Sequence, residues 1–173
     1  MMFPELATDR LILRVHVASD FDALAAQWAD PAVVYHIGEV QTREQAWARL
    51  LRFVGHWHVR GYGTFAAIDR ETHHYVGSLG IASFERDLDP AAYTALATHE
   101  ASWVLTRDAQ GKGYATEGMR AALAWHDKAF PGIPTGCIVD VENVGSVRVA
   151  EKLGYREVKR THYHGKPIVI FGR

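Results

Sequence analysis

The sequence predicts an α/β domain, and two patterns in it carry that prediction. Short runs of alternating apolar and polar residues, typical of half-buried strands, are separated by segments with apolar residues at helical spacing. Their order is strand, two helices, three strands, helix, strand, helix and two strands. We expect one domain over residues 1–173, because a chain of this length can bury a sizeable core without disulfides.

The first strand and helix are predicted from alternation and from helix-start signals. Apolar residues alternate over 10–16, which predicts a strand with one buried face. Ser19 and Asp22 have the spacing of a capping box, so a helix is expected to begin beside them. Asp30 and Pro31 are expected to end it, because a residue before proline disfavours the helical conformation.

A second capping-box pair, Thr42 and Gln45, stands before a longer apolar stripe that predicts another helix. Gly61 and Gly63 are expected to end this helix. Two strands joined by a polar turn are predicted to follow, at residues 64–68 and 75–81.

The second half of the chain begins with a predicted surface loop at 83–98, with or without a short helical turn, that borders the substrate site. Regular elements are expected after it. They are a strand at 100–106, a helix at 113–128, a strand at 137–141, a helix at 144–153, and strands at 155–161 and 168–172.

The composition excludes several classes of protein. Hydrophobic residues make up 48% and charged residues 23%, as in ordinary soluble domains. A formal net charge of −1 gives no general attraction to nucleic acid or to an anionic membrane, so neither is expected as a partner. The one cysteine, Cys137, allows no internal disulfide, and the sequence has neither a spanning apolar run nor a signal-peptide pattern. A cytoplasmic location is therefore expected.

The segment Gln110-Gly111-Lys112-Gly113-Tyr114-Ala115-Thr116 lies between a predicted strand and a predicted helix. The first N–H groups of a helix lack intrahelical partners, and the helix dipole adds partial positive charge there. The glycines leave room for an anion to approach the backbone, the lysine adds a charge and the threonine a hydroxyl. The segment therefore predicts an anion-binding loop, with a plain helix cap as the alternative. Its tyrosine either covers a bound ligand or packs beneath the loop.

The sequence of residues 110–116 does not match two familiar phosphate-binding loops. No Gly-Lys pair completes the G-x-x-x-x-G-K-[ST] spacing of a mononucleotide P-loop. The dinucleotide fingerprint G-x-G-x-x-G would need a glycine at Thr116, which counts against a nucleotide-binding oxidoreductase.

A third pattern does fit. Gln110-x-x-Gly113-x-Ala115 resembles the acyl-CoA pyrophosphate loop of the GNAT superfamily of N-acyltransferases, (Q/R)-x-x-G-x-(G/A). Further segments resemble the Rim-type branch, which acetylates ribosomal-protein N-termini and related amines. They are Leu6–Arg14, Gly61–Gly63, Val76–Ser78, and Asn143-x-x-Ser146-x-Arg148 followed by Lys152–Tyr155.

The resemblance implies the GNAT fold, a mixed and mostly antiparallel sheet of about seven strands flanked by about four helices. It implies acetyl-CoA as the co-substrate, with its pyrophosphate on residues 110–116. The central strand would splay from its neighbour and offer the backbone of Val104, Leu105 and Thr106 to the pantetheine arm. Neither a metal nor a covalent enzyme intermediate is implied.

Acyl transfer to an amine needs a base, because an amine is mostly protonated near neutral pH. Glu100 is the first candidate, since it begins the predicted central strand, where the resembling branch often has a glutamate. His99 is the neighbouring alternative, with an unperturbed pKa closer to neutral. Asp140 is a third. A solvated strand end for Glu100 and a turn cap for Asp140 are the structural alternatives.

The leaving thiolate calls for a proton donor, and here the sequence departs from the superfamily. Many GNAT enzymes have a tyrosine four residues before the glycine of the closing Leu-Gly motif, but that position is Ala150. Ser146 lies one helical turn earlier on the same face. We expect it either to hydrogen-bond the coenzyme sulfur or to help cap the short helix. Asn143 is expected to cap that helix, to bind the pantetheine amide, or both.

Close histidine pairs suggest a metal site, but no cysteine or carboxylate cluster completes a zinc-type ligand set beside them. No metal is therefore expected. The pairs are His56 and His58, His73 and His74, and His162 and His164.

Together with the resemblance, these residues predict an acetyl-CoA-dependent N-acetyltransferase, in which a primary amine attacks directly within a ternary complex. The alternative is an acyl-CoA-binding sensor or interaction module on the same fold, which an intact loop without a working base would indicate. The sequence leaves open whether the acceptor is a protein N-terminus or a small molecule and whether the acyl group is longer. It also leaves open whether the chain forms a homodimer.

Overall fold

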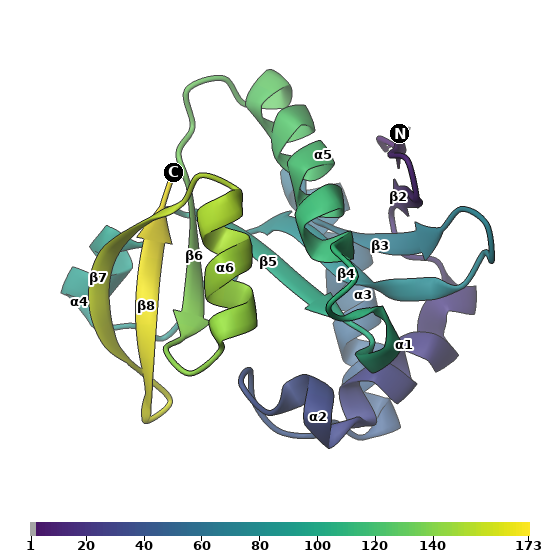
Figure 1. Ribbon diagram of the computed structural model, residues 1–173, viewed down its shortest axis with the longest axis horizontal. Helices are drawn as coiled ribbons and strands as arrows, with labels where there is room; N and C mark the ends of the chain where they lie inside the picture. Colours follow the sequence, from purple (N-terminus) through teal and green to yellow (C-terminus); the bar gives the residue numbers. More distant parts are fainter. Residues whose placement is uncertain (1–2) are drawn as a thin grey trace.

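The computed structural model describes residues 3–173, and one mixed sheet runs through it (Figure 1). Eight strands form this sheet in the order β1-β2-β3-β4-β5-β6-β8-β7. Their bounds are β1 (Leu6–Ala7), β2 (Leu11–Arg14), β3 (Thr64–Asp69), β4 (Tyr75–Ala82), β5 (His99–Leu105), β6 (Thr135–Asp140), β7 (Arg156–Tyr163) and β8 (Lys166–Gly172).

Six α-helices lie within the described residues, together with two short 3₁₀ turns, η1 (Ala18–Asp20) and η2 (Arg107–Ala109). The helices are α1 (Phe21–Ala29), α2 (Pro31–Val34), α3 (Arg43–Arg60), α4 (Pro90–Ala95), α5 (Tyr114–Ala129) and α6 (Val144–Lys152).

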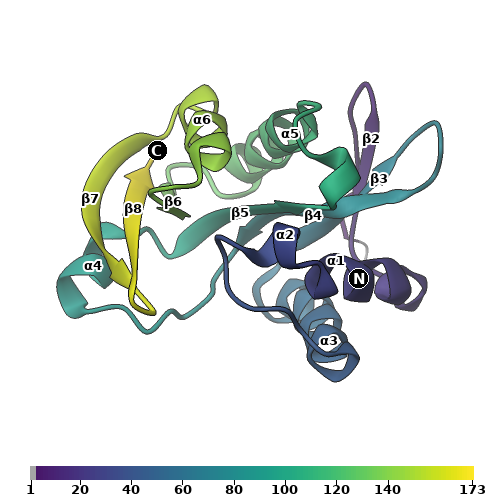
Figure 2. The same cartoon turned by 60° about the horizontal axis from the view of Figure 1, so that its bottom comes forward.

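The longer helices form a layer on each face of the sheet. Figure 2 shows α5 and α6 on one face and α1, α2 and α3 on the other. Met119 of α5 shares one buried cluster with Leu11 and Leu79 of the strands. Leu24 of α1 shares a second buried cluster with Leu50 of α3. Both faces of the central strands are therefore covered, which is why β3 and β4 are buried along almost their whole length.

The strands β5 and β6 form the one parallel pair found among residues 3–173, and they pair only at the start of β5. His99 faces Thr135 and Glu100 faces Gly136, and beyond these positions the two strands diverge (Figure 1). Residues 101–105 of β5 therefore have a partner in β4 but none in β6. This gap in the sheet positions the candidate site.

The predicted α/β fold and its mostly antiparallel sheet are confirmed. The predicted elements follow one another as expected, with β1, α2 and α4 added between them, the last in the loop at 83–98. The described residues contain eight strands and six α-helices, whereas about seven and about four were expected. Among the shortest elements are β1 with 2 residues, α2 with 4 and α4 with 6, which sequence periodicity does not resolve.

One of the two predicted capping boxes is wrong. Thr42 and Gln45 form theirs, since the Gln45 N–H donates to Thr42 Oγ1 and the Thr42 N–H to Gln45 Oε1. Ser19 does not pair with Asp22, because Ser19 lies inside η1. The carboxylate that organises this turn belongs to Asp20, which accepts the Val17 N–H and a bidentate contact from Arg14.

The stop at Asp30 and Pro31 is confirmed for α1, which ends at Ala29. Pro31 also opens α2, with the Asp30 carboxylate accepting the Ala32 N–H at 2.9 Å. Proline fits this first position of a helix because its missing N–H would have no intrahelical partner there.

His16 is a buried titratable group, with only 2% of its surface exposed. Its Nε2 lies 3.0 Å from Ser78 Oγ, and its ring lies against Phe53. Burial lowers the pKa of His16 from 6.5 to about 4, because the charged imidazole would lose its hydration. The folded protein therefore holds this histidine neutral over a pH range in which the unfolded chain protonates it.

We predict that His16 makes the fold sensitive to acid between about pH 6.5 and pH 4. The unfolded state binds the extra proton, so stability is fully present above pH 6.5 and falls as the pH drops. The total loss is on the order of 3 kcal/mol. His16→Gln removes this titration, and its free energy of unfolding should vary less with pH over that interval.

Denaturant unfolding at several pH values measures the effect, with the exposed His74→Gln as the matched control. A His16→Gln protein whose stability falls as steeply as that of the wild type would contradict the assignment.

Candidate functional site

The predicted anion loop, residues 110–116, joins β5 to α5 after η2. Gly111 and Gly113 have φ values of 73° and 81°, left-handed conformations that glycine adopts without strain. Gly113 is also the N-cap of α5. Within residues 3–173, the N–H groups of residues 111–116 form no backbone hydrogen bond of standard geometry outside the regular elements. These free donors at the positive end of a helix suit an anion.

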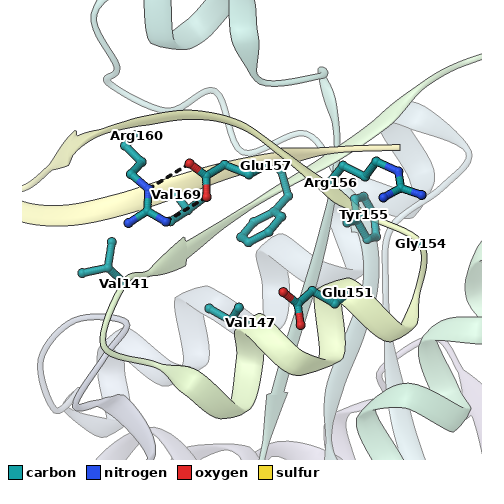
Figure 3. Close-up of a pocket in the computed structure, with 10 residues that line it drawn as sticks. Val141, Val147, Glu151, Gly154, Tyr155, Arg156, Glu157, Arg160 and Val169 are labelled. Atoms are coloured by element: carbon teal, nitrogen blue, oxygen red, sulfur yellow. Dashed lines mark hydrogen bonds and ion pairs between the residues drawn. The ribbon is translucent and has the colours of Figure 1, made fainter.

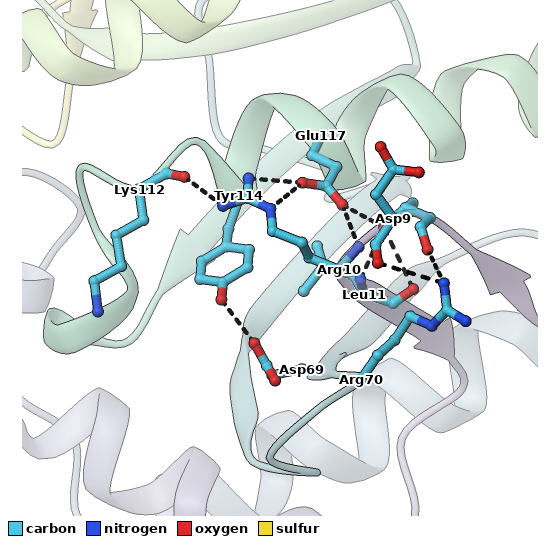
Figure 4. Close-up of polar contacts among 9 residues, drawn as sticks. Asp9, Arg10, Leu11, Asp69, Arg70, Lys112, Tyr114 and Glu117 are labelled. Atoms are coloured by element: carbon cyan, nitrogen blue, oxygen red, sulfur yellow. Dashed lines mark hydrogen bonds and ion pairs between the residues drawn. The ribbon is translucent and has the colours of Figure 1, made fainter.

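The loop is fixed from its outer side by Arg10 and Glu117 (Figure 4). Arg10 donates from Nη1 to the Lys112 carbonyl at 2.9 Å and from Nε to Glu117 Oε2 at 2.7 Å. Glu117 also accepts the Thr8 hydroxyl at 2.6 Å. Burial opposes ionisation of Glu117, but the hydrogen bonds from Thr8 and Arg10 outweigh it and lower its pKa. The N-terminal residues thus hold the loop in place.

Tyr114 belongs to the same network. Its hydroxyl donates to Asp69 Oδ2 at 2.6 Å, and the Arg10 guanidinium lies 4.5 Å from the centre of its ring. The Tyr114 hydroxyl and the Thr72 N–H lower the pKa of Asp69 to about 2. Of the two predicted roles for Tyr114, this arrangement favours packing beside the loop, against the β3–β4 turn.

A pocket of about 730 Å³, here called the central pocket, occupies the gap between β5 and β6. It is lined by residues of α3, by the loop at 36–41, by the middle of β5 and the end of β6, and by the first turn of α6. Residues 110–116 do not line it. The anion loop and the central pocket are therefore separate parts of the candidate site.

Glu100 lines the central pocket and is 3% exposed. Arg86 donates from Nε to Oε2 at 2.8 Å and from Nη2 to Oε1 at 2.6 Å. Burial raises the pKa of Glu100, against the opposing effect of Arg86. Glu100 is thus a buried and oriented carboxylate, not a solvated strand end.

The two alternative bases lie in different surroundings. His99 Nδ1 is 2.7 Å from His126 Nε2 of α5, its ring stacks on Tyr62, and it does not line the central pocket. Burial and His126 lower its pKa. Successive side chains of a strand point to opposite faces, which separates His99 from Glu100.

Asp140 does line the central pocket, together with His36 from the loop after α2. Its Oδ2 lies 3.2 Å from His36 Nδ1, and its Oδ1 accepts the Glu142 N–H at 2.9 Å. Asp140 therefore caps the following turn and also holds a histidine at the pocket.

The start of α6 brings Asn143 and Ser146 to the central pocket. Asn143 Oδ1 accepts the Ser146 N–H at 3.1 Å, so Asn143 caps the helix. The Ser146 hydroxyl accepts the Trp103 indole N–H at 3.3 Å, and its own hydrogen has no acceptor within residues 3–173. Ser146 Oγ is therefore not the cap. Ala150, one turn later, is fully buried.

Two of the three residues predicted to receive the pantetheine arm, Val104 and Leu105, lie in the part of β5 without a β6 partner, whereas Thr106 lies beyond the strand. The Val104 carbonyl accepts Gln27 Nε2 at 2.7 Å, and the Leu105 carbonyl accepts Gln110 Nε2 at 3.3 Å. The Thr106 N–H donates to the Val76 carbonyl at 2.9 Å. The residues without a β6 partner are 101–105, so the gap begins directly after Glu100.

Several residues of the central pocket were not among those predicted. Arg86 comes from the predicted surface loop, and His36 follows α2. Arg49 and Arg52 lie on α3 beside its apolar stripe, at a spacing that puts both on one face. That spacing was visible in the sequence, but nothing in the sequence showed what the face would meet.

A second cavity of about 520 Å³ lies between α6 and the strands β7 and β8 (Figure 3). Val147 and Tyr155 are on its wall, and the ion pair of Glu157 with Arg160 lies at its side. It shares no lining residue with the central pocket. Nothing links it to the gap in the sheet.

Metal ligands do not gather in groups of three or more His, Cys, Asp or Glu side chains anywhere in residues 3–173. No helix in the described part of the chain is long and apolar enough to cross a membrane.

Comparisons with known proteins agree with this geometry. The family model of the acetyltransferase (GNAT) domain matches residues 10–156. The uncharacterised protein YkkB of Bacillus subtilis (strain 168) is 30% identical over 177 residues, which cover 98% of this chain and 95% of that protein.

Solved structures show the same fold. A Bordetella pertussis protein described as a GNAT-family acetyltransferase has a TM-score of 0.85 and 28% identity, covering 98% of this chain and 99% of that one. RimL, a ribosomal L7/L12 alpha-N-protein acetyltransferase in complex with coenzyme A, has a TM-score of 0.73 and 17% identity, covering 98% and 97%. The predicted GNAT fold is thereby confirmed.

Proposed function

We propose that this chain, which belongs to the GNAT acetyltransferase family, transfers an acetyl group from acetyl-CoA to a primary amine within a ternary complex. The observation that carries the proposal is the pairing of a free-donor loop with a pocket in the gap between β5 and β6. The structure of RimL with coenzyme A supports the same co-substrate for this fold.

The residues present fit acetyl-CoA. Its pyrophosphate needs closely spaced N–H donors, which residues 111–116 offer, and its approach needs the absence of side chains at Gly111 and Gly113. Beyond Gly111 a Cβ atom would meet nothing within 4 Å, so the surface there is open. Gln110, Lys112, Ala115 and Thr116 complete the loop that we assign to the co-substrate, as expected from the sequence.

Glu100 is the proposed acceptor of the amine proton. A carboxylate has about four lone-pair positions. Of the contacts from Arg86, only one reaches Oε2, so this oxygen keeps a lone pair that can accept a proton. Burial raises the Glu100 pKa toward neutral pH, where a general base is most effective. The pair of His36 and Asp140 is the second candidate, because it lines the same pocket.

Ser146 is proposed to hydrogen-bond the departing sulfur. Its hydroxyl hydrogen is free while its oxygen accepts from Trp103, so the orientation of the hydroxyl is fixed without using the proton. Asn143 supports this position by capping α6. The alternative function, an acyl-CoA-binding sensor without catalysis, would keep the loop but require none of these groups to act.

The first prediction of this mechanism compares Gly113→Asp with Gly113→Asn. Both side chains tolerate the left-handed conformation, but only aspartate puts a negative charge beside the pyrophosphate. Gly113→Asp should weaken acetyl-CoA binding at least about tenfold more than Gly113→Asn. Titration calorimetry on folded proteins measures this, and equal affinities would show that residues 111–116 are not the pyrophosphate site.

The second prediction compares Glu100→Gln with Asp140→Asn. Loss of a general base lowers the rate about 10²- to 10⁴-fold and removes the acidic limb of the pH–rate profile. We expect this from Glu100→Gln. Glutamine can still accept from Arg86, which limits the cost of leaving a guanidinium without its anion.

Melting curves establish that both variants are folded before their pH profiles are compared. If the acidic limb is kept by Glu100→Gln and lost in Asp140→Asn, the base is the pair of Asp140 and His36. Full activity in both variants would show that neither Glu100 nor Asp140 is the base.

The third prediction separates Ser146 from the helix cap. Ser146→Ala should lower kcat about tenfold, the effect of one lost hydrogen bond, and leave the melting temperature almost unchanged. Asn143→Ala should cost about 1 kcal/mol of stability as a lost cap. An unchanged kcat in Ser146→Ala would show that Ser146 does not assist departure of the thiolate, which would then be solvated or protonated by water.

A further inference from the structure

The face of α3 that meets the central pocket carries two arginines. Gln45, Arg49, Arg52 and Phe53 all line the pocket, at the i, i+4, i+7 and i+8 spacing of one helical stripe. Arg49 is half-buried and Arg52 is exposed. Neither guanidinium has a carboxylate within 4.0 Å among residues 3–173, although Arg43 and Arg60 of the same helix each have one.

Arg49 is held firmly in place without an anion. Its Nε donates to Gln41 Oε1 at 3.0 Å, and its guanidinium carbon lies 3.5 Å from the centre of the Trp28 ring. Stacking on an aromatic ring fixes the plane of the guanidinium and leaves the remaining N–H groups free to bind. An arginine oriented in this way is suited to a planar anion.

The charges around the pocket do not balance. Glu100 is paired with Arg86, and Asp140 lies beside His36, which carries a charge only when protonated. Lys166 also lines the pocket and donates to the Tyr35 carbonyl. Asp140 and Glu39 are the remaining carboxylates on the pocket wall, against the three cations Arg49, Arg52 and Lys166. The pocket therefore has a surplus of positive charge, although the formal net charge of the whole chain is −1.

Two buried polar atoms of the pocket wall also lack partners. Trp28 Nε1 and Thr64 Oγ1 have no hydrogen-bond partner within residues 3–173, and their residues are 6% and 3% exposed. An indole N–H can only donate. Both atoms are buried behind the pocket surface, so the donors that a ligand in the pocket could reach are the two arginines.

The two arginines lie on the face of the sheet opposite to the anion loop, where the phosphates of the co-substrate are expected to bind. The anion loop precedes α5, whereas α3 covers the opposite face (Figure 2). Residues 110–116 do not line the pocket that Arg49 and Arg52 line. The arginines therefore face the side left for the acceptor.

We infer that Arg49 and Arg52 bind a carboxylate on the acceptor, so that the preferred substrate is a small amine that also carries a carboxylate. This inference rests on the proposed acetyltransferase function and specifies its acceptor. The carboxylate would occupy the α3 side of the central pocket, with the amine directed toward Glu100 and the gap between β5 and β6.

The electrostatics of the arginines agree with this assignment. Burial of Arg49 and the nearby Arg52 lower the pKa of Arg49 to about 9, and Arg86 acts in the same direction. The three guanidiniums thus oppose one another's charge. A bound carboxylate would relieve that repulsion, because an opposite charge favours the charged form of each arginine.

The test uses pairs of acceptors that differ only in charge. Amino acids with different spacing between amine and carboxylate are each compared with the corresponding primary amide, with acetyl-CoA as donor and thiol release as readout. The measured quantity is the ratio of kcat/KM for acid over amide. Because both members of a pair are measured on one protein, changes in folding or in acetyl-CoA binding cancel from the ratio.

For the best acid, Arg49→Gln and Arg52→Gln should each lower this ratio about 10- to 100-fold, the effect of one charge-assisted hydrogen-bonded contact. Arg43→Gln removes a charge from the same helix outside the pocket and should leave the ratio as in the wild type.

If amines are acetylated but the ratio is the same in Arg49→Gln, Arg52→Gln and wild type, the carboxylate inference is wrong and the proposed function stands. If the folded protein binds acetyl-CoA but acetylates no amine of the panel, the carboxylate inference is wrong; if it also acetylates no peptide N-terminus and no simple alkylamine, the proposed function fails as well.

Discussion

The short pairing of β5 with β6 is the constraint on which the site depends. β6 pairs with β8 at five positions but with β5 at only two, so β6 follows the C-terminal hairpin away from the rest of the sheet. A buried backbone polar group needs a partner, and β6 supplies none beyond Glu100. Gln110 supplies one of these partners, to the carbonyl of Leu105. The remaining groups are left for water or for a ligand, and this is why a pocket forms here.

The ion pair of Arg86 with Glu100 connects this gap to the loop that precedes α4. A buried carboxylate alone would lose its hydration without compensation, so it would take up a proton. Arg86 keeps the group oriented, while burial on the other side keeps its pKa above the usual range. Removing either partner leaves an uncompensated charge, which costs far more than the pair contributes. The loop at 83–98 therefore contributes a residue to the wall of the candidate site even though it contains little regular structure.

Features that depend on neighbours in the sequence were predictable, and features that depend on the fold were not. The capping box of Thr42 with Gln45 and the loop at 110–116 are local, so their spacing was sufficient to predict them. Ser19 and Asp22 have the same spacing, but the predicted capping box is wrong. Asp20 accepts the Val17 N–H instead, and its carboxylate is held by Arg14. His36 approaches Asp140 across 104 positions of chain. No periodicity could have brought these two residues, or Arg49 and Glu100, to one pocket.

The positive surplus of the central pocket bears on how an amine can react there. Guanidinium groups near an ammonium lower its pKa, so they favour the neutral amine that attack requires. They also repel a protonated amine on its way in, and Glu100 does little to offset this because Arg86 is bound to it. An acceptor that carries its own carboxylate resolves the conflict, since it enters with no net charge. With its carboxylate on Arg49 and Arg52, such an acceptor would direct its amine toward Glu100 at the gap between the strands, without a positive surplus to repel it.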